Sequence, residues 1–123
     1  MEKLEVGKWY RFDNGRFSAI FSETAQGNSN IVIFQGNEIK IYIDRNGEPP
    51  FNGYETLETL TPKEALILLA NGFVLEKKEN YLYAIKDDCL KHNNQGGKGK
   101  WFAAVSCLSL TGFTIHALPS EGK

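Results

Sequence analysis

Cysteine is scarce in this sequence, since the 123 residues include only Cys89 and Cys107. Two thiols are too few for the disulfide framework of a small secreted domain. The N-terminal segment has no apolar signal core, and no apolar run approaches the roughly 18 residues that a membrane-spanning helix needs. We therefore expect a cytoplasmic protein with reduced thiols and no membrane among its partners.

A surplus of positive charge is also missing, because 14 Lys and Arg residues stand against 15 Asp and Glu residues and the net charge is −1. Proteins that bind duplex DNA normally carry a strong basic excess, because neutralising phosphates supplies much of their affinity. Duplex DNA is therefore not expected as the main partner, although a local basic patch stays open. With 41% hydrophobic residues, the chain is expected to form a single folded domain over residues 1–123.

Aromatic residues (12%) and glycines (12 in number) are plentiful, and one stretch alone has a helical pattern. This composition predicts an α+β fold that is mostly antiparallel β, either a meander or a small barrel, with one short helix. Asn14-Gly15 and Gly36-Asn37 are hairpin signals between apolar runs. Four strands in meander order are therefore expected in the first part of the chain, at residues 8–13, 16–22, 31–34 and 39–44.

The last of these strands alternates strictly, so Ile39, Ile41 and Ile43 share one face and more polar residues share the other. Residues 45–56 follow, with two prolines and two Asn-Gly pairs, and predict a long turn-rich connection. This connection is the best candidate for a boundary between two subdomains. They would be a β-meander at residues 1–48 and a helix with antiparallel strands at residues 57–118.

A helix N-terminus is predicted at Thr61-Pro62-Lys63-Glu64, which has a capping box and a proline at the first helical position. An apolar stripe follows, and Asn71-Gly72 predicts the helix end. A helix of about ten residues is not stable alone, so it must pack on a sheet. Beyond it we expect a hairpin of strands 73–76 and 81–86, a polar loop 92–100, and last strands 101–107 and 113–117 joined through residues 111–112.

Few residues suit catalysis. A nucleophile and base would have to come from Cys89 or Cys107 with His92 or His116, and no motif such as a nucleophile elbow surrounds them. His116 alternates within a strand and is expected at the surface or at a sheet edge. The same four side chains are zinc-ligand types, but their spacing lacks the paired knuckles of common structural sites. We assign no catalytic residue, no metal and no cofactor. The one adjacent acidic pair, Asp87-Asp88, is explained by a turn.

A basic, glycine-rich loop at residues 95–101 is the best candidate for ligand binding. It is not a nucleotide-hydrolysing P-loop, because neither Gly-Lys pair is followed by Ser or Thr and a strand follows instead of a helix. Its glycines can expose backbone N–H groups, Lys98 and Lys100 add charge, and Trp101 offers a stacking face. The other interpretation is a flexible loop that its lysines keep in solvent.

A second candidate surface lies on the first predicted strand, where Trp9 and Arg11 share one face and Tyr10 and Phe12 share the other. Most of these aromatic side chains must be core, and a face left in solvent would suit a partner or a stacked base. The predicted ligand-binding residues are accordingly Lys98, Lys100, Trp101, Trp9 and Arg11.

Two segments resemble proteins of bacteriophages. Residues 4–12 (LEVGKWYRF) resemble the opening of many small accessory proteins of phages and prophages. Residues 61–85 resemble a helix–turn–hairpin in phage proteins that include a Thoeris anti-defence family, which sequesters cyclic nucleotide signals. Shared residues are Glu64-Ala65-Leu66, Asn71-Gly72 and Tyr81-Leu82-Tyr83. The family usually carries a basic residue and a Trp soon after the helix, whereas residues 75–78 here contain no Trp, so its ligand site does not carry over.

The sequence therefore favours a non-enzymatic binding protein. The resemblance implies a phage-encoded inhibitor that acts in the host cytoplasm, either on a host protein or by sequestering a small signalling nucleotide. One alternative is a single-stranded nucleic-acid-binding module that uses aromatic strand faces and the lysine loop. Another is a small hydrolase with an unrecognised site.

Overall fold

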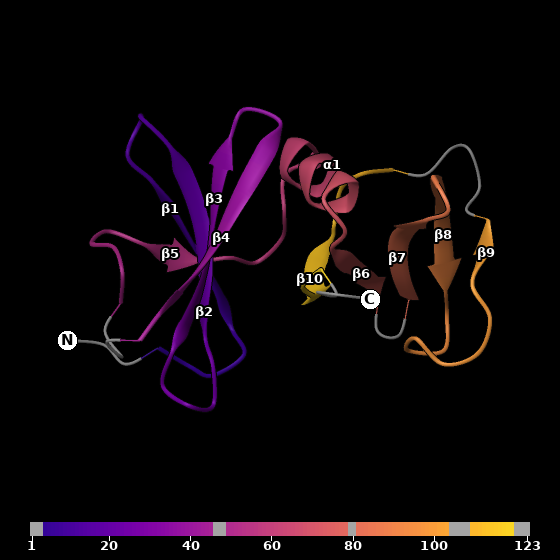
Figure 1. Ribbon diagram of the computed structural model, residues 1–123, viewed down its shortest axis with the longest axis horizontal. Coiled ribbons are helices and arrows are strands. Elements are labelled where there is room, and N and C mark those ends of the chain that lie inside the picture. The colour runs from indigo at the N-terminus through magenta and orange to yellow at the C-terminus, as the bar shows by residue number, and fades with distance from the viewer. Residues whose placement is uncertain (1–3, 46–48, 79–80, 104–108, 120–123) are drawn as a thin grey trace. The chain divides into compact units, whose positions relative to one another are not determined.

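The computed structural model describes residues 4–45, 49–78, 81–103 and 109–119. These residues form two antiparallel sheets of five strands each and one short helix (Figure 1). The predicted α+β class, mostly antiparallel β with one helix, is confirmed. Both sheets are open, with two edges each, so the meander and not the small barrel is the form taken. Among the described residues no helix has the length and apolar character to cross a membrane.

The chain divides into two compact units, Met1–Glu58 and Thr59–Lys123. Each unit contains one of the two sheets. The first sheet has the strand order β4-β3-β2-β1-β5. Its members are β1 (Trp9–Asp13), β2 (Ser18–Glu23), β3 (Ser29–Gln35), β4 (Glu38–Asp44) and β5 (Glu55–Thr56). The predicted four-strand meander is confirmed, and β5 returns to pair with β1 on the side away from β2.

The turns of this meander follow from local chemistry. Gly36 has φ 64° at the first position of the two-residue loop that joins β3 to β4, a backbone conformation that glycine adopts without a Cβ penalty. In the loop after β1, the Asp13 carboxylate accepts hydrogen bonds from the Gly15 N–H (2.8 Å) and the Ser18 hydroxyl (2.9 Å). These contacts hold the pKa of Asp13 below its ordinary value, the Gly15 N–H contributing most.

Aromatic side chains form the core of the first unit. Tyr10 and Phe21 stack on one sheet face with centroids 5.7 Å apart, in a cluster completed by Leu4 and Ile31. Residues from the predicted connection 45–56 cover this cluster, since the ring of Phe51 stacks on Phe12 at 4.3 Å. Such ring pairs contribute about 0.5–1.5 kcal/mol each beyond area burial. That segment therefore packs as part of the first unit's core.

The isoleucines of β4 share one face, as their alternation predicts. The register pairs Ile41 with Val32, while Tyr42 pairs with Ile31 of the aromatic core. The isoleucines therefore lie on the sheet face opposite to the aromatic cluster. Ile41 and Ile43 remain 42% and 56% exposed. Val32, which shares the face of Ile41, is fully buried, so burial on this face ends at the edge strand. Alternation groups these side chains, but it does not say how deeply each is buried.

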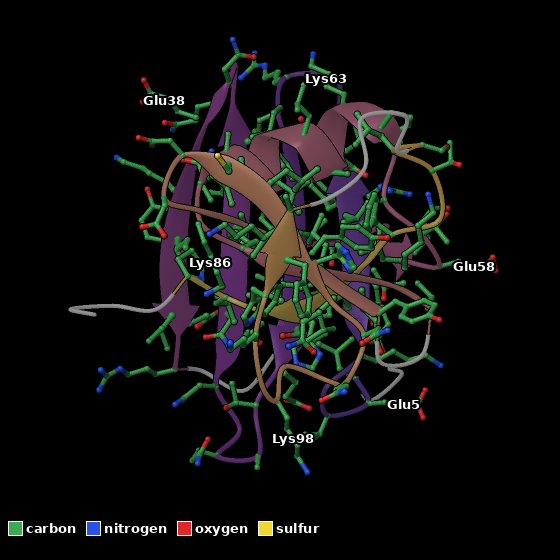
Figure 2. All side chains as sticks on the ribbon, turned by 90° about the vertical axis from the view of Figure 1, so that its right-hand side faces the viewer. Glu5, Glu38, Glu58, Lys63, Lys86 and Lys98 are labelled. Carbon is green, nitrogen blue, oxygen red and sulfur yellow. The ribbon has the colours of Figure 1, made fainter. Side chains whose placement is uncertain are left out.

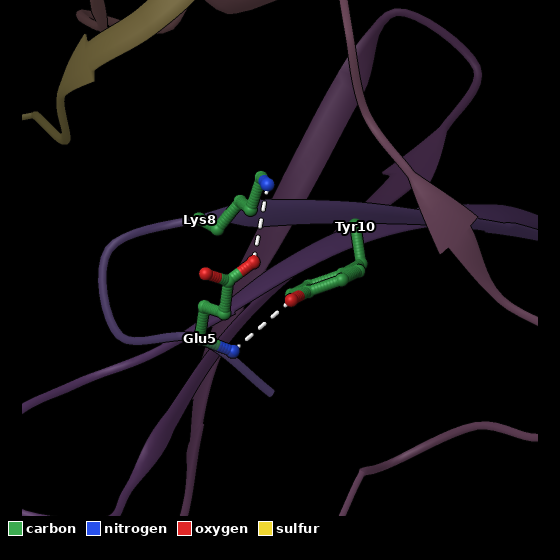
Figure 3. Close-up of polar contacts among 3 residues, drawn as sticks. All are labelled: Glu5, Lys8 and Tyr10. Carbon is green, nitrogen blue, oxygen red and sulfur yellow. Dashed lines mark hydrogen bonds and ion pairs between the residues drawn. The ribbon is translucent and has the colours of Figure 1, made fainter. Parts of the chain in front are cut away.

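The chain before β1 is tied down by Tyr10 (Figure 3). The buried ring of Tyr10 places its hydroxyl to accept a hydrogen bond from the Glu5 N–H at 3.0 Å. The Glu5 carboxylate in turn forms an ion pair with Lys8 at 3.1 Å, which raises the pKa of Lys8. Because both charged groups are exposed, the pair orients the segment and contributes little to stability.

The second unit begins with α1 (Pro62–Ala70), which has the predicted capping box. The Thr61 hydroxyl accepts from the Glu64 N–H at 3.1 Å, and the Glu64 carboxylate accepts from the Thr61 N–H at 2.8 Å. The buried side chains of α1 include Leu68 and Leu69, and the helix packs against β6 (Val74–Lys78) and β7 (Tyr81–Lys86). Residues 61–78 and 81–85 thus contain a helix followed by two antiparallel strands.

The second sheet has the order β10-β6-β7-β8-β9. Its remaining strands are β8 (Cys89–Asn93), β9 (Phe102–Ala103) and β10 (Thr114–Ala117). The strand β8 includes residues 92 and 93, the first two residues of the predicted polar loop. It was not predicted, because its sequence Cys-Leu-Lys-His-Asn has no apolar alternation. The predicted last strands lie at opposite edges of the sheet, and residues 104–107 of the first fall outside the described residues.

Acid should weaken the first unit partly through Asp13. Its folded-state pKa lies below the ordinary value of 3.8, so its stabilising contribution is present above that pH and is lost as the pH falls through the folded-state pKa. We expect Asp13→Asn to lose less stability than the wild type between about pH 4 and about pH 2. Urea-unfolding midpoints across that range would check this, and two parallel pH profiles would contradict it.

A glycine in the turn between β7 and β8 should stabilise the protein. Asp87 and Asp88 have φ 55° and 64°, left-handed conformations that cost a residue with a Cβ about 1 kcal/mol. This geometry confirms the turn predicted there. Asp88→Gly should raise the free energy of unfolding by about 0.5 kcal/mol, measured by urea unfolding. The matched control is Asn37→Gly in the other two-residue hairpin, where φ is not positive and the same change should not stabilise.

Candidate functional site

The basic loop between β8 and β9 is organised by one buried amide. The Asn93 side chain is only 2% exposed and lies beside Leu82 on the same sheet face. Its Oδ1 accepts hydrogen bonds from the N–H groups of Gln95 (2.8 Å) and Gly97 (2.9 Å). Its Nδ2 donates to the carbonyls of Lys98 (2.8 Å) and Lys100 (3.1 Å). One side chain therefore holds the main chain of the loop at four points.

The loop also covers the sheet. A Cβ placed on Gly97 would lie 3.4 Å from Cδ1 of Leu82, a side chain that is 1% exposed. Gly96, Gly97 and Gly99 all have positive φ, so the path of the loop depends on glycine at these positions. The loop is thus a defined structure packed on Leu82, and its lysine side chains extend from a fixed main chain.

This arrangement changes how the loop could hold an anion. Two of the N–H groups that the glycine-rich pattern offers to a phosphate, those of Gln95 and Gly97, are used by Asn93. The N–H of Lys98 donates to the carbonyl of Gln95 at 3.3 Å. The lysine ammonium groups are therefore the better candidates for anion contacts, and Figure 2 shows the Lys98 side chain pointing away from the sheet at the end of the loop.

Trp101 follows the loop and meets a lysine from another strand. The Lys86 ammonium lies 4.8 Å from the centre of the Trp101 ring, within the range of a cation–π contact. Lys86 ends β7, so the sheet places its charge beside an aromatic ring that is far away in sequence. We refer to Lys86, Lys98, Lys100 and Trp101 as the lysine–tryptophan surface. Lys100 and Trp101 are neighbours in the chain, whereas Figure 2 shows Lys86 and Lys98 well apart on the second sheet.

The remaining predicted ligand residues, Trp9 and Arg11, lie on β1 in the first unit. Tyr10 and Phe12, which alternate with them, face the aromatic core, so Trp9 and Arg11 share the opposite face as predicted. Both are partly exposed. The predicted set is therefore divided between two units, each of which holds part of it.

The geometry separates the candidate catalytic pair. Cys89 and His92 are three residues apart on the regular strand β8, so their side chains project from opposite faces of the sheet. His116 is exposed on the edge strand β10, as predicted. Cys107 lies outside the described residues. Within the described ranges, no three His, Cys, Asp or Glu side chains gather closely enough to hold a metal ion.

A row of aromatic rings on the second sheet was not found by sequence reasoning. The Tyr83 ring lies 6.0 Å from the His92 ring and 5.4 Å, edge to face, from Phe113. His92 in turn lies 6.2 Å from Phe102, which is 57% exposed. Register brings these residues together across three strands, and only the strand assignment of β8 could have revealed it.

Asn93 was also missed. The available signal was an asparagine placed shortly before three glycines, since asparagine side chains commonly bond the backbone of a following turn.

Comparisons with protein-family models, with curated proteins and with solved structures find no match to this chain.

Removing the Asn93 amide should open the loop and expose Leu82. Asn93→Ala leaves two N–H groups and two carbonyls without their partner, and we expect the free energy of unfolding to fall by about 2–3 kcal/mol. The exposed neighbour provides the control, because Asn94→Ala should change stability by no more than about 0.5 kcal/mol. Chemical denaturation of both variants would measure this. Equal stability of the two would contradict the role assigned to Asn93.

Proposed function

We propose that this protein is a non-enzymatic binding protein that sequesters a small signalling nucleotide at the lysine–tryptophan surface. The single observation that carries the proposal is the buried Asn93 amide, which fixes the backbone of Lys98 and Lys100 while their side chains stay exposed. A loop ordered before binding loses less conformational entropy when a ligand docks. A loop that is already ordered therefore favours tight binding of a ligand.

The chemistry of the surface matches the two parts of a nucleotide. Lys98 and Lys100 supply ammonium groups for phosphate oxygens, and charge-assisted hydrogen bonds of this type contribute about 1.5–3 kcal/mol each. Trp101 supplies a ring on which a base can stack, worth about 1–3 kcal/mol. The Lys86 ammonium, 4.8 Å from that ring, would leave the ring face as the base takes its place.

The proposal includes no bond cleavage. A thiol nucleophile needs a base within hydrogen-bond reach, and Cys89 and His92 project from opposite faces of β8. The segment that resembles nucleotide-sequestering phage proteins forms α1 and the β6–β7 hairpin, which carries Lys86 at its end. The corresponding biological role would be that of a phage-encoded protein that sequesters a nucleotide signal in the host cytoplasm.

Calorimetric titration with a panel of cyclic mono- and dinucleotides would test the proposal. We expect binding by the wild type, and affinity about tenfold weaker for Lys98→Ala and for Lys100→Ala, because each loses a charged hydrogen bond. Lys63→Ala is the matched control, since it removes the same charge from the exposed start of α1 and should leave affinity unchanged. Equal affinity of all three variants would contradict the site.

The same complex distinguishes the competing functions. Ligand released by denaturation should have the mass of the ligand added, and a cleaved product would indicate a hydrolase. Affinity should fall only shallowly as salt rises from about 50 to about 200 mM, because few phosphates are contacted. A steep loss, together with preference for an oligonucleotide, would instead support the single-stranded nucleic-acid alternative.

A further inference from the structure

The strand β4 is an unusually open edge. It is the end strand of the first sheet, and no strand of the described chain pairs with its outer side. It is seven residues long and pairs with β3 without a register shift. By contrast, the edge strand β5 has two residues, and β10 has four with a register shift. Long, regular edges invite pairing with another strand, and proteins normally shorten, bend or cover them.

The main chain of β4 offers a defined set of groups to such a strand. Gln35 and Glu38 flank a two-residue hairpin loop, so Glu38 directs its N–H and C=O towards β3. In an antiparallel ladder this direction alternates from residue to residue. The N–H and C=O groups of Ile39, Ile41 and Ile43 consequently point to the open edge.

At this edge β4 exposes isoleucines on one face and Tyr42 among charged residues on the other. Ile41 and Ile43 are 42% and 56% exposed on one face, and Tyr42 is 45% exposed on the other. Lys40 lies on the same face as Tyr42, with its ammonium 6.0 Å from the tyrosine ring. Asp44 shares that face as well, two residues further along. Charge of both signs therefore brackets an exposed aromatic residue.

This pattern is self-complementary over five residues in the antiparallel register centred on Tyr42. If two copies of β4 pair about a two-fold axis at Tyr42, Lys40 of each copy faces Asp44 of the other, and Ile41 faces Ile43. A register centred on Ile41 would place Glu38 opposite Asp44, and one centred on Lys40 would place two lysines opposite each other. Like charges directly opposite are destabilising. A register centred on Ile39 also pairs opposite charges, Glu38 with Lys40, but it aligns three residues of β4 where the Tyr42 register aligns five. Charge and the length of pairing together therefore favour the Tyr42 register.

We propose that this protein forms a two-fold dimer by antiparallel pairing of β4 with β4 of a second copy, centred on Tyr42. Across the axis, the outward N–H and C=O groups of Ile41 in each copy pair with those of Ile43 in the other copy. The two first sheets then become one continuous sheet. The Tyr42 pair lies at a position without ladder hydrogen bonds, where opposite side chains approach most closely.

Disulfide trapping tests the register. In a background with Cys89→Ser and Cys107→Ser, Tyr42→Cys places two thiols at the axis, where Cα atoms about 4.5 Å apart suit a disulfide. Mild oxidation should give a covalent dimer on a non-reducing gel. Lys40→Cys is the matched control, because its thiols would lie too far apart across the same axis. Equal cross-linking of both variants, or of neither, would overturn the proposal.

Charge exchange tests the dimer without cysteines. By sedimentation, the wild type should dimerise, whereas Lys40→Glu and Asp44→Lys should each associate at least about tenfold more weakly, since each places like charges opposite. Mixing the two variants should restore a heterodimer, in which both charge pairs are again opposite in sign. Circular dichroism of each variant checks folding. A wild type that stays monomeric at about 100 µM, or a mixture that does not associate, would contradict this dimer.

Discussion

An open β-sheet must keep the apolar side chains on its faces away from water, and the described chain offers one helix of nine residues for this purpose. Covering therefore falls to loops and to aromatic side chains. In the first unit, Phe51 from the segment after β4 stacks on Phe12 and contacts Phe21. In the second unit, the loop after β8 lies on Leu82. Both loops are structural elements because the sheets beneath them would otherwise expose apolar side chains.

A loop that covers a sheet must satisfy its own backbone, and Asn93 shows how this is done. The amide has two acceptor sites and two donor hydrogens, and all of this capacity is directed at loop N–H and carbonyl groups. A buried polar group with partners adds specificity, whereas one without partners is costly. The same hydrogen bonds that fix the loop also fix the main-chain positions from which the Lys98 and Lys100 side chains extend. Structural support and the candidate ligand site thus depend on one side chain.

The two units treat their apolar surface differently. In the second unit, Tyr83 and Phe113 pack edge to face, and the Lys77 ammonium lies 5.2 Å from the Phe113 ring. In the first unit, Ile41 and Ile43 stay exposed beside an open strand edge. Exposed apolar side chains next to unpaired main-chain groups favour association, and the charges on β4 restrict which association is favourable. The proposed ligand site and the proposed dimer edge therefore lie on different sheets.

The sequence alone determined those features that depend on residues close together in the chain. The capping box at Thr61 and Glu64 places the helix start, because both hydrogen bonds span three residues. Gly36 places a hairpin, because the turn needs a positive φ at that residue. The alternation of Ile39, Ile41 and Ile43 groups them on one face, because strand side chains have a period of two.

Only the tertiary structure decided how deeply each strand is buried, since alternation is the same in a buried and in an exposed strand. Val32 is fully buried, whereas Ile41, its neighbour on the same face, is 42% exposed. The tertiary structure also assigned β8, whose polar sequence forms a strand because β7 and β9 supply the pairing on either side. The partners of Asn93 and the meeting of Lys86 with Trp101 depend on that strand. Contacts of this kind depend on strand register, which residues distant in the sequence set jointly, and no local pattern contains it.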